Sequence, residues 1–393
     1  MYFRTMVVAL LVSMGCANAQ PVDINTKVSL EYRHFVDSPI HVGQSGRSNS
    51  SVSLEPEFYW TSDDGNHSVL FKPFARLDER DDERTHTDVR ELLWTYVDDG
   101  WELKAGIGKV FWGVTEFQHL VDTINQNDDV EDIDGEDKLG QPMVNLSLAH
   151  DWGILDLYLL PYFRERTFPG VDGRLRGSQV IDQNSAVFES SAGKERLDLA
   201  VRWSHSFSDY DVGVHFFEGT NRTPVVQFDD DRLTPYYQQM TQIGVDLQAT
   251  KGDWLLKFEA LHRDTSLQDY SAVQAGFEYT FVGVAGSSAD IGMLAEYSWD
   301  ERGDELGGSD FQNDIYVGTR LAFNDTQSTE LLIGGGYDID HEGSKFIVEG
   351  SRRLGSNWKA IIEARIFNDN SELAPAFGLR RDDMLQLTIE RYF

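Results

Sequence analysis

The chain has 393 residues, a formal net charge of −32 and 12% aromatic residues. This acidity excludes nucleic acid as a partner, because binding to nucleic acid requires a basic face. After the N-terminal region no stretch reaches the roughly 18 consecutive apolar residues of a membrane helix, and the single cysteine, Cys16, excludes an internal disulfide framework.

The first residues predict a signal peptide. "MYFR" supplies the positive charge of Arg4, "TMVVALLVSMG" is an apolar segment of suitable length, and "ANA" before Gln20 fits a small-x-small cleavage site. "SMG" before Cys16 is a poor lipobox, so cleavage after Ala19 is favoured over lipidation. We therefore expect residues 1–19 to be removed and residues 20–393 to form one exported domain.

From there on, runs of about ten residues alternate apolar with polar or small residues. In "WELKAGIG", Trp101, Leu103 and Ile107 share one face and Lys104 lies on the other. Such runs suit transmembrane strands of about 9–11 residues better than the shorter strands of a soluble sandwich. The pattern predicts an all-β fold, a transmembrane antiparallel up-and-down β-barrel of 18 strands. Sixteen strands is the alternative, because the runs near Phe58 and Leu93 alternate poorly. The expected strand centres are Leu30, Phe58, Phe71, Leu93, Leu103, Leu146, Leu157, Val201, Val214, Val245, Phe258, Phe277, Met293, Val317, Ile333, Val348, Ile362 and Leu387.

Short and long connections alternate along the chain. Short turns are expected at 98–100, 151–153, 207–210, 251–253, 324–327 and 355–357. Long polar connections are expected at 38–50, 77–86, 113–141, 164–194, 219–235, 300–310 and 368–382. This asymmetry is typical of bacterial outer-membrane barrels, whose short turns face the periplasm.

Aromatic residues gather near the expected strand ends. Trp101, Trp254 and Trp358 each follow a short turn, and with Trp299 and Phe393 they are the predicted aromatic girdle at the membrane interface. The last residues, "LTIERYF", resemble the C-terminal signal by which bacterial barrels are recognised for insertion, although Arg391 departs from it. The resemblance implies the barrel-assembly machinery as a partner.

One connection carries a second resemblance: "GKVFWGVTEFQHLVDTINQNDDVEDIDGEDKLGQP". Its first part is similar to a segment of porin-like outer-membrane families, in which G-x-x-x-x-W-G is followed by D-x-I/L-N-x-x-D. The matching residues are Gly108, Trp112, Gly113, Asp122, Ile124, Asn125 and Asp128. The resemblance implies a pore-forming barrel and leaves the solute open.

The same connection, near 113–141, is predicted to fold into the lumen as a constriction, because its start is too apolar for a free outer loop. Its acidic run and the arginines of the next long connection would then create a transverse field across the pore. The predicted constriction residues are Asp122, Asp128, Asp129, Glu131, Asp132, Arg164, Arg166, Arg174 and Arg176. Lumen-facing residues predicted from strand alternation are Lys104, Arg202, Lys257, Glu259, Arg320, Glu363 and Arg365. The alternative is that both connections face outside water.

The predicted function is a channel for passive diffusion of small hydrophilic solutes across the bacterial outer membrane. Export of an acidic polysaccharide and a non-conducting adhesin or scaffold are the alternatives. No enzyme is predicted, because no catalytic motif is present. No cofactor or metal is predicted either, since an EF-hand register on "DIDGED" would begin at Val130 and reach Gln141 at its twelfth position. The expected surroundings are outer-membrane lipid and lipopolysaccharide, and a homo-oligomer is compatible with the pattern.

Overall fold

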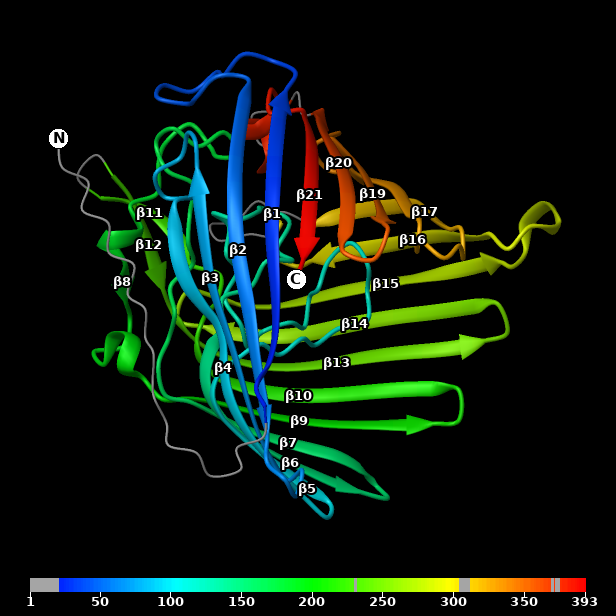
Figure 1. Cartoon of the computed structure of the whole chain (residues 1–393). Helices are drawn as coiled ribbons and strands as arrows, with labels where there is room; N and C mark the ends of the chain where they lie inside the picture. The colour runs from blue at the N-terminus through cyan, green and yellow to red at the C-terminus, as the bar shows by residue number, and fades with distance from the viewer. Residues whose placement is uncertain (1–20, 230–231, 304–311, 369–370, 372–374) are drawn as a thin grey trace.

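The computed structural model describes residues 21–229, 232–303, 312–368, 371 and 375–393. The predicted signal peptide, 1–19, lies outside the described residues. The dominant element is an 18-stranded antiparallel sheet in which each strand pairs with its neighbours along the chain. Because β1 pairs with both β2 and β21, the sheet closes into a barrel without a free edge (Figure 1). Among the described residues, no helix is long and apolar enough to cross a membrane.

All the predicted strand centres fall within barrel strands, which confirms 18 strands and rules out sixteen. The barrel strands are β1 (Asp23–Phe35), β2 (Ser48–Thr61), β3 (His67–Asp78), β4 (His86–Asp98), β5 (Trp101–Gly108), β6 (Gln141–His150), β7 (Gly153–Leu160), β9 (Asp198–Phe207), β10 (Tyr210–Thr220), β13 (Gln239–Lys251), β14 (Trp254–Thr265), β15 (Asp269–Phe281), β16 (Asp290–Asp300), β17 (Asn313–Ala322), β18 (Glu330–Asp338), β19 (Ser344–Leu354), β20 (Trp358–Asn368) and β21 (Met384–Tyr392).

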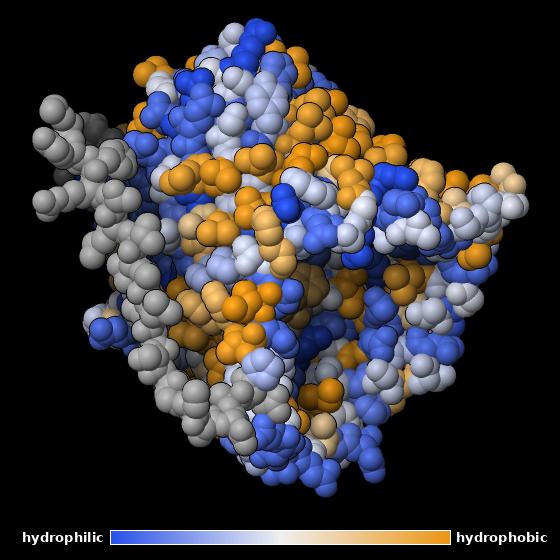
Figure 2. Space-filling view, viewed as in Figure 1, coloured by the Kyte–Doolittle hydropathy of each residue, from blue (hydrophilic) through white to orange (hydrophobic). Residues whose placement is uncertain are grey.

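The strands alternate between an apolar outer face and a polar inner face. In β1, Leu30 and Tyr32 are exposed on the outside, whereas Glu31 and Arg33 are buried on the inside. Figure 2 shows apolar side chains gathered over the outer surface of β20 and β21, with polar side chains toward the strand ends. This arrangement is the inverse of a soluble sandwich, in which the apolar face would be buried.

The wall is irregular where β2, β3 and β4 meet. The β2–β3 ladder is interrupted between the pairs Leu54–Ala75 and Phe58–Phe71, and the β3–β4 register shifts between Lys72 and Pro73. A bulge flips the facing of the residues beyond it. This shift explains why strict alternation was weak in the sequence here.

The barrel has two different ends. The short turns and both described chain ends lie at one end, where the backbones of Thr26 and Phe393 exchange hydrogen bonds of 3.1 and 3.4 Å. Long connections leave the other end, and two of them build a small sheet of β8 (Val187–Phe188), β11 (Val225–Asp229) and β12 (Arg232–Tyr237). Both connections were predicted from the sequence to be loops. The 3₁₀ helices are η1 (Gln183–Ser185), η2 (Gly193–Glu195), η3 (Val284–Gly286) and η4 (Pro375–Leu379).

The five aromatic residues predicted as a girdle do not share one rim. Trp101, Trp254 and Trp358 begin β5, β14 and β20 at the short-turn end, and Phe393 lies at the same end, hydrogen-bonded to Thr26 near the start of β1. Trp299 is near the opposite end, because β16 runs toward the long connections.

Candidate functional site

The connection between β5 and β6, residues 109–140, lies inside the barrel, and we call it the inward loop (Figure 1). Its Val121 and Ile124 side chains are completely buried. It contacts inner-face residues of β1, β3, β4, β13, β14, β16, β17 and β20. Because these strands lie on several sides of the barrel, the inward loop crosses its interior.

Residues of the porin-like segment form the base of the inward loop. The Asn125 side chain donates hydrogen bonds to the carbonyls of Gly108 (2.9 Å) and Leu139 (2.8 Å) and accepts one from the backbone of Val110 (2.8 Å). These bonds hold the two ends of the loop together where they leave β5 and return to β6. The segment is therefore a structural frame for an inward loop.

The second half of the frame centres on Trp112, which is 3% exposed. Its ring packs against Tyr158 and His215, and its backbone donates a 3.3 Å hydrogen bond to Asp122. Asp122 also forms a 3.1 Å ion pair with Lys138 within the loop. Burial raises the pKa of Asp122 above its ordinary value.

A buried glutamate on β14 anchors the middle of the inward loop. Glu259 is fully buried, and its carboxylate accepts hydrogen bonds from the backbones of Val114 (2.6 Å), Thr115 (2.9 Å) and Val121 (3.2 Å). The Thr115 hydroxyl donates a further bond of 2.7 Å. Gly113 has φ +127°, and a Cβ there would lie 2.9 Å from the Glu259 carboxylate. Glycine therefore permits the close approach of backbone and carboxylate.

The tip of the inward loop crosses to β16 and β17. The backbones of Glu116 and Phe117 donate hydrogen bonds to Glu296 (2.8 and 3.1 Å), and the Glu116 carboxylate pairs with Lys257 (3.4 Å) and Arg320. Both cations were predicted to face the lumen, and the structure places them on the inner wall.

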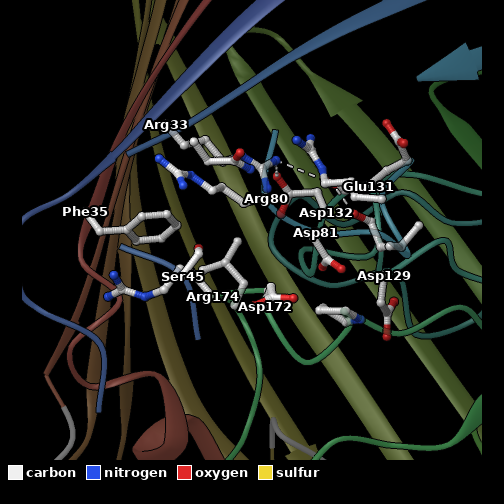
Figure 3. A pocket seen from close by; sticks show the side chains of 16 residues that line it. Arg33, Phe35, Ser45, Arg80, Asp81, Asp129, Glu131, Asp132, Asp172 and Arg174 are labelled. Atoms are coloured by element: carbon white, nitrogen blue, oxygen red, sulfur yellow. Dashed lines mark hydrogen bonds and ion pairs between the residues drawn. The ribbon is translucent and has the colours of Figure 1, made fainter. Parts of the chain in front are cut away.

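The acidic arm of the inward loop, residues 128–134, returns along the other side of the barrel. Its carboxylates pair with guanidinium groups of the wall. The pairs are Asp128 with Arg90, Glu131 with Arg76 (2.6 Å), Asp132 with Arg33 (3.3 Å) and Arg365, and Asp134 with Arg365 (2.7 Å). Figure 3 shows Arg33, Glu131 and Asp132 converging at this place. Each charge is matched within the low-dielectric interior, where an unpaired charge is costly.

Two loop carboxyls illustrate opposite electrostatic settings. Burial opposes ionisation of Glu131, but the hydrogen bond from His86 and the charges of Arg76 and Arg84 outweigh it and lower the pKa to about 2. Burial inside the barrel raises the pKa of Asp137 to about 7, and neighbouring carboxylates, Glu131 first, add to the increase. The Asp137 side chain nevertheless keeps access to solvent. We therefore expect Asp137 to change its charge near neutral pH.

The predicted arginine cluster divides into two groups. Arg164 pairs with Asp88 of β4 (2.7 Å) and donates a hydrogen bond to the Gly140 carbonyl (3.0 Å), and Arg166 pairs with Asp129 (3.5 Å), so these two reach the edge of the inward loop. Arg174 instead pairs with Asp382 (2.7 Å). Arg176 donates to the carbonyls of Val42 and Val171.

The predicted transverse field between the acidic run and all four arginines is therefore wrong for Arg174 and Arg176. These two side chains bind neighbouring outer connections together. The carboxylates of Asp128, Glu131, Asp132 and Asp134 pair with arginines of the barrel strands, over a few ångströms instead of across the pore.

Four arginines of this cluster were not predicted from the sequence: Arg33, Arg76, Arg84 and Arg90. The first two alternate with apolar residues at the ends of β1 and β3, and that alternation was the available signal. Arg84 follows β3 in a connection, and Arg90 is at the bulge, so no local pattern marked either.

On the short-turn side of the inward loop, charged side chains of the inner wall are accessible to solvent. The Lys104 and Arg320 side chains are 34% and 38% exposed although both face inward. Arg202 pairs with Asp246 (2.6 Å), and Glu363 with Arg365 (2.7 Å), on the same inner face. Partly exposed charges on an inner face indicate a solvent-filled vestibule. No group of three or more His, Cys, Asp or Glu side chains in the described ranges is arranged to hold a metal ion.

No protein-family model matches the sequence, and no curated protein matches it significantly. Among solved structures, the chain is similar to a BenF-like porin from Pseudomonas fluorescens Pf-5, with a TM-score of 0.58 and 11% identity over 95% of this chain and 99% of that chain. It is also similar to OpdQ of Pseudomonas aeruginosa, with a TM-score of 0.51 and 11% identity over 95% of this chain and 97% of that chain. The chain has the fold of an outer-membrane porin. The predicted porin-like barrel is thus confirmed at the level of the fold.

Proposed function

We propose that the protein is a passive channel for small hydrophilic solutes in the bacterial outer membrane. The observation that carries this proposal is an inward loop fixed to opposite walls of a closed barrel, above a vestibule lined with partly exposed charges. Such a loop narrows the lumen, so that passage depends on solute size and charge. The channel uses no energy input and no covalent chemistry.

The paired charges give the constriction a specific electrical character. The wall contributes arginines and the loop contributes carboxylates, so the net field at the narrow part depends on both. Removing the acidic arm leaves Arg33, Arg76, Arg90 and Arg365 facing open water. The expected result is a wider channel that prefers anions.

The test is reconstitution of the purified protein in planar lipid bilayers. Intact protein is expected to give discrete conductance steps, and deletion of 122–137 is expected to raise the conductance and shift the reversal potential toward anion selectivity. A double variant of the short-turn rim, Asp98→Asn with Asp99→Asn, removes negative charge without touching the loop and is the control. Absence of steps in the intact protein would contradict a channel, whereas unchanged selectivity after deletion would contradict only the constriction.

A further inference from the structure

The hydrogen-bonded ladder between β2 and β3 is interrupted near the middle of the two strands. By the register of the flanking pairs, Pro56 and Pro73 are directly opposite each other, and the ladder is interrupted around them. Proline has no backbone N–H to donate, so two facing prolines leave this part of the ladder with fewer backbone hydrogen bonds, although the Lys72–Glu57 ion pair (2.9 Å) still links the strands.

A groove of about 720 Å³ lies beside these prolines and extends over β4 to the ends of β5 and β6, on the outer, lipid-facing side of the barrel. It is lined by Leu54, Pro56, Pro73, Phe74, Ala75, Thr87, Asp88, Val89, Ile107, Pro142, Tyr162 and Arg164. Its volume falls within the roughly 300–1,000 Å³ of typical ligand sites. Nine of the twelve lining residues are apolar or aromatic, which suits a hydrocarbon chain.

The groove ends within the wall. Phe74 is a buried inner residue, and Asp88 is held by Arg164 at 2.7 Å, yet both line the groove. The Arg90 guanidinium lies 4.3 Å from the centre of the Phe74 ring, and Arg164 also donates a 3.0 Å hydrogen bond to the carbonyl of Gly140. These contacts close the inner end, so the groove is a dead end for a hydrocarbon chain.

A second, polar cavity of about 320 Å³ adjoins the groove and shares Tyr162 and Arg164 with it. Three cations line this cavity, Arg164, Arg166 and Lys194, with a single carboxylate, Glu165, which pairs with Lys194. Asp88 and Asp129 pair with the two arginines from outside the cavity. Guanidinium and ammonium groups are the usual partners of phosphate in proteins.

The two cavities together fit an amphiphile with an apolar chain and an anionic head. Thr87 is the second residue of β4 and Pro142 is the second residue of β6, so both lie at the barrel end that carries the long connections. These ends face the outer leaflet if the protein has its proposed place in the outer membrane, and lipopolysaccharide forms that leaflet. We propose that the groove binds an acyl chain of lipopolysaccharide and that the adjoining cavity binds one of its phosphates. This inference rests on the proposed location.

The test measures lipid retained by the protein after purification from outer membranes in a mild detergent. Lipopolysaccharide and phospholipid are quantified separately by mass spectrometry of the intact complex. The intact protein is expected to keep lipopolysaccharide, and Ala75→Trp, which fills the groove, is expected to reduce retention by about tenfold. Ala295→Trp places the same side chain on the lipid-facing surface of β16 and is the matched control.

A second variant guards against misfolding of the first. Lys194→Gln removes a cation of the polar cavity at an exposed position and is expected to lower retention of lipopolysaccharide while bilayer conductance stays unchanged. Equal retention by Ala75→Trp and Ala295→Trp, or retention of phospholipid in place of lipopolysaccharide, would overturn the proposal. Because conductance is recorded on the same samples, a failed channel and a failed lipid site give different results.

Discussion

The anchor at Glu259 gives the sharpest test of the inward loop as a constriction. Its carboxylate accepts three backbone hydrogen bonds and one from the Thr115 hydroxyl, all in a fully buried setting. Hydrogen bonds to charged groups contribute about 1.5–3 kcal/mol each, and a buried donor left unsatisfied costs about 1–3 kcal/mol. Glu259→Ala orphans the three backbone donors, so we expect the bound position of the loop to lose more than about 4 kcal/mol.

Glu259→Gln is a graded version of the same change. The amide keeps one oxygen, which can serve Val114 and Thr115, and loses the acceptor that faces the Val121 backbone at 3.2 Å. We expect a loss of about 1–3 kcal/mol, so that the loop remains mostly in place. The alanine variant should therefore have higher single-channel conductance and noisier open states than the glutamine variant.

The assay is single-channel recording, with limited proteolysis of the inward loop as an independent readout. Glu102→Ala on β5 is the control, because it removes an inner-face carboxylate that pairs with Lys104 and does not contact the loop. If Glu259→Ala keeps the conductance, noise and protease resistance of the intact protein, the loop is not held by this anchor and the reasoning fails.

Three further predictions follow from the same contacts. Asp137, whose pKa is raised to about 7, is neutral below that pH and charged above it, so cation preference measured by reversal potential should increase from about pH 6 to 8, and Asp137→Asn should flatten this increase. Arg365→Gln leaves buried Asp132 with one cation fewer and should lower the free energy of unfolding in urea by about 3–5 kcal/mol, whereas the same change at exposed Arg352 should cost less than about 1 kcal/mol. Gly113→Ala should weaken the loop anchor and raise conductance in the direction of Glu259→Ala, and an unchanged conductance would contradict the close approach.

The strands could be predicted because the membrane imposes a simple rule on them. Side chains such as Leu30 and Tyr32 face lipid while their neighbours face the interior, so period two appears directly in the sequence. Within the strands that the structure describes, the rule fails at the β3–β4 register shift beside Pro73, where a bulge changes the facing. The inward direction of the loop was also readable, because its first residues are too apolar for free exposure.

Charge partners could not be predicted, because they depend on contacts between distant parts of the chain. Arg174 donates a hydrogen bond to Asp382, which is 208 positions away in the sequence, and Arg33 donates one to Asp132, which is 99 positions away. A basic residue in an outer connection looks the same in the sequence whether it faces a pore or joins two loops. The small outer sheet was missed for a related reason, since its strands are short and pair across two separate connections.

The ion-pair cluster around Asp132 also bears on how the molecule is assembled. Its members come from β1, the inward loop and β20, and the Arg365–Asp132 contact spans 233 positions of sequence. Until β20 and β21 join the sheet, Asp132 lacks Arg365 and Arg33 lacks Gln386, so the cluster is incomplete. We therefore expect the inward loop to dock when β21 pairs with β1 and closes the barrel. Before that step, the inner face of the incomplete sheet stays hydrated.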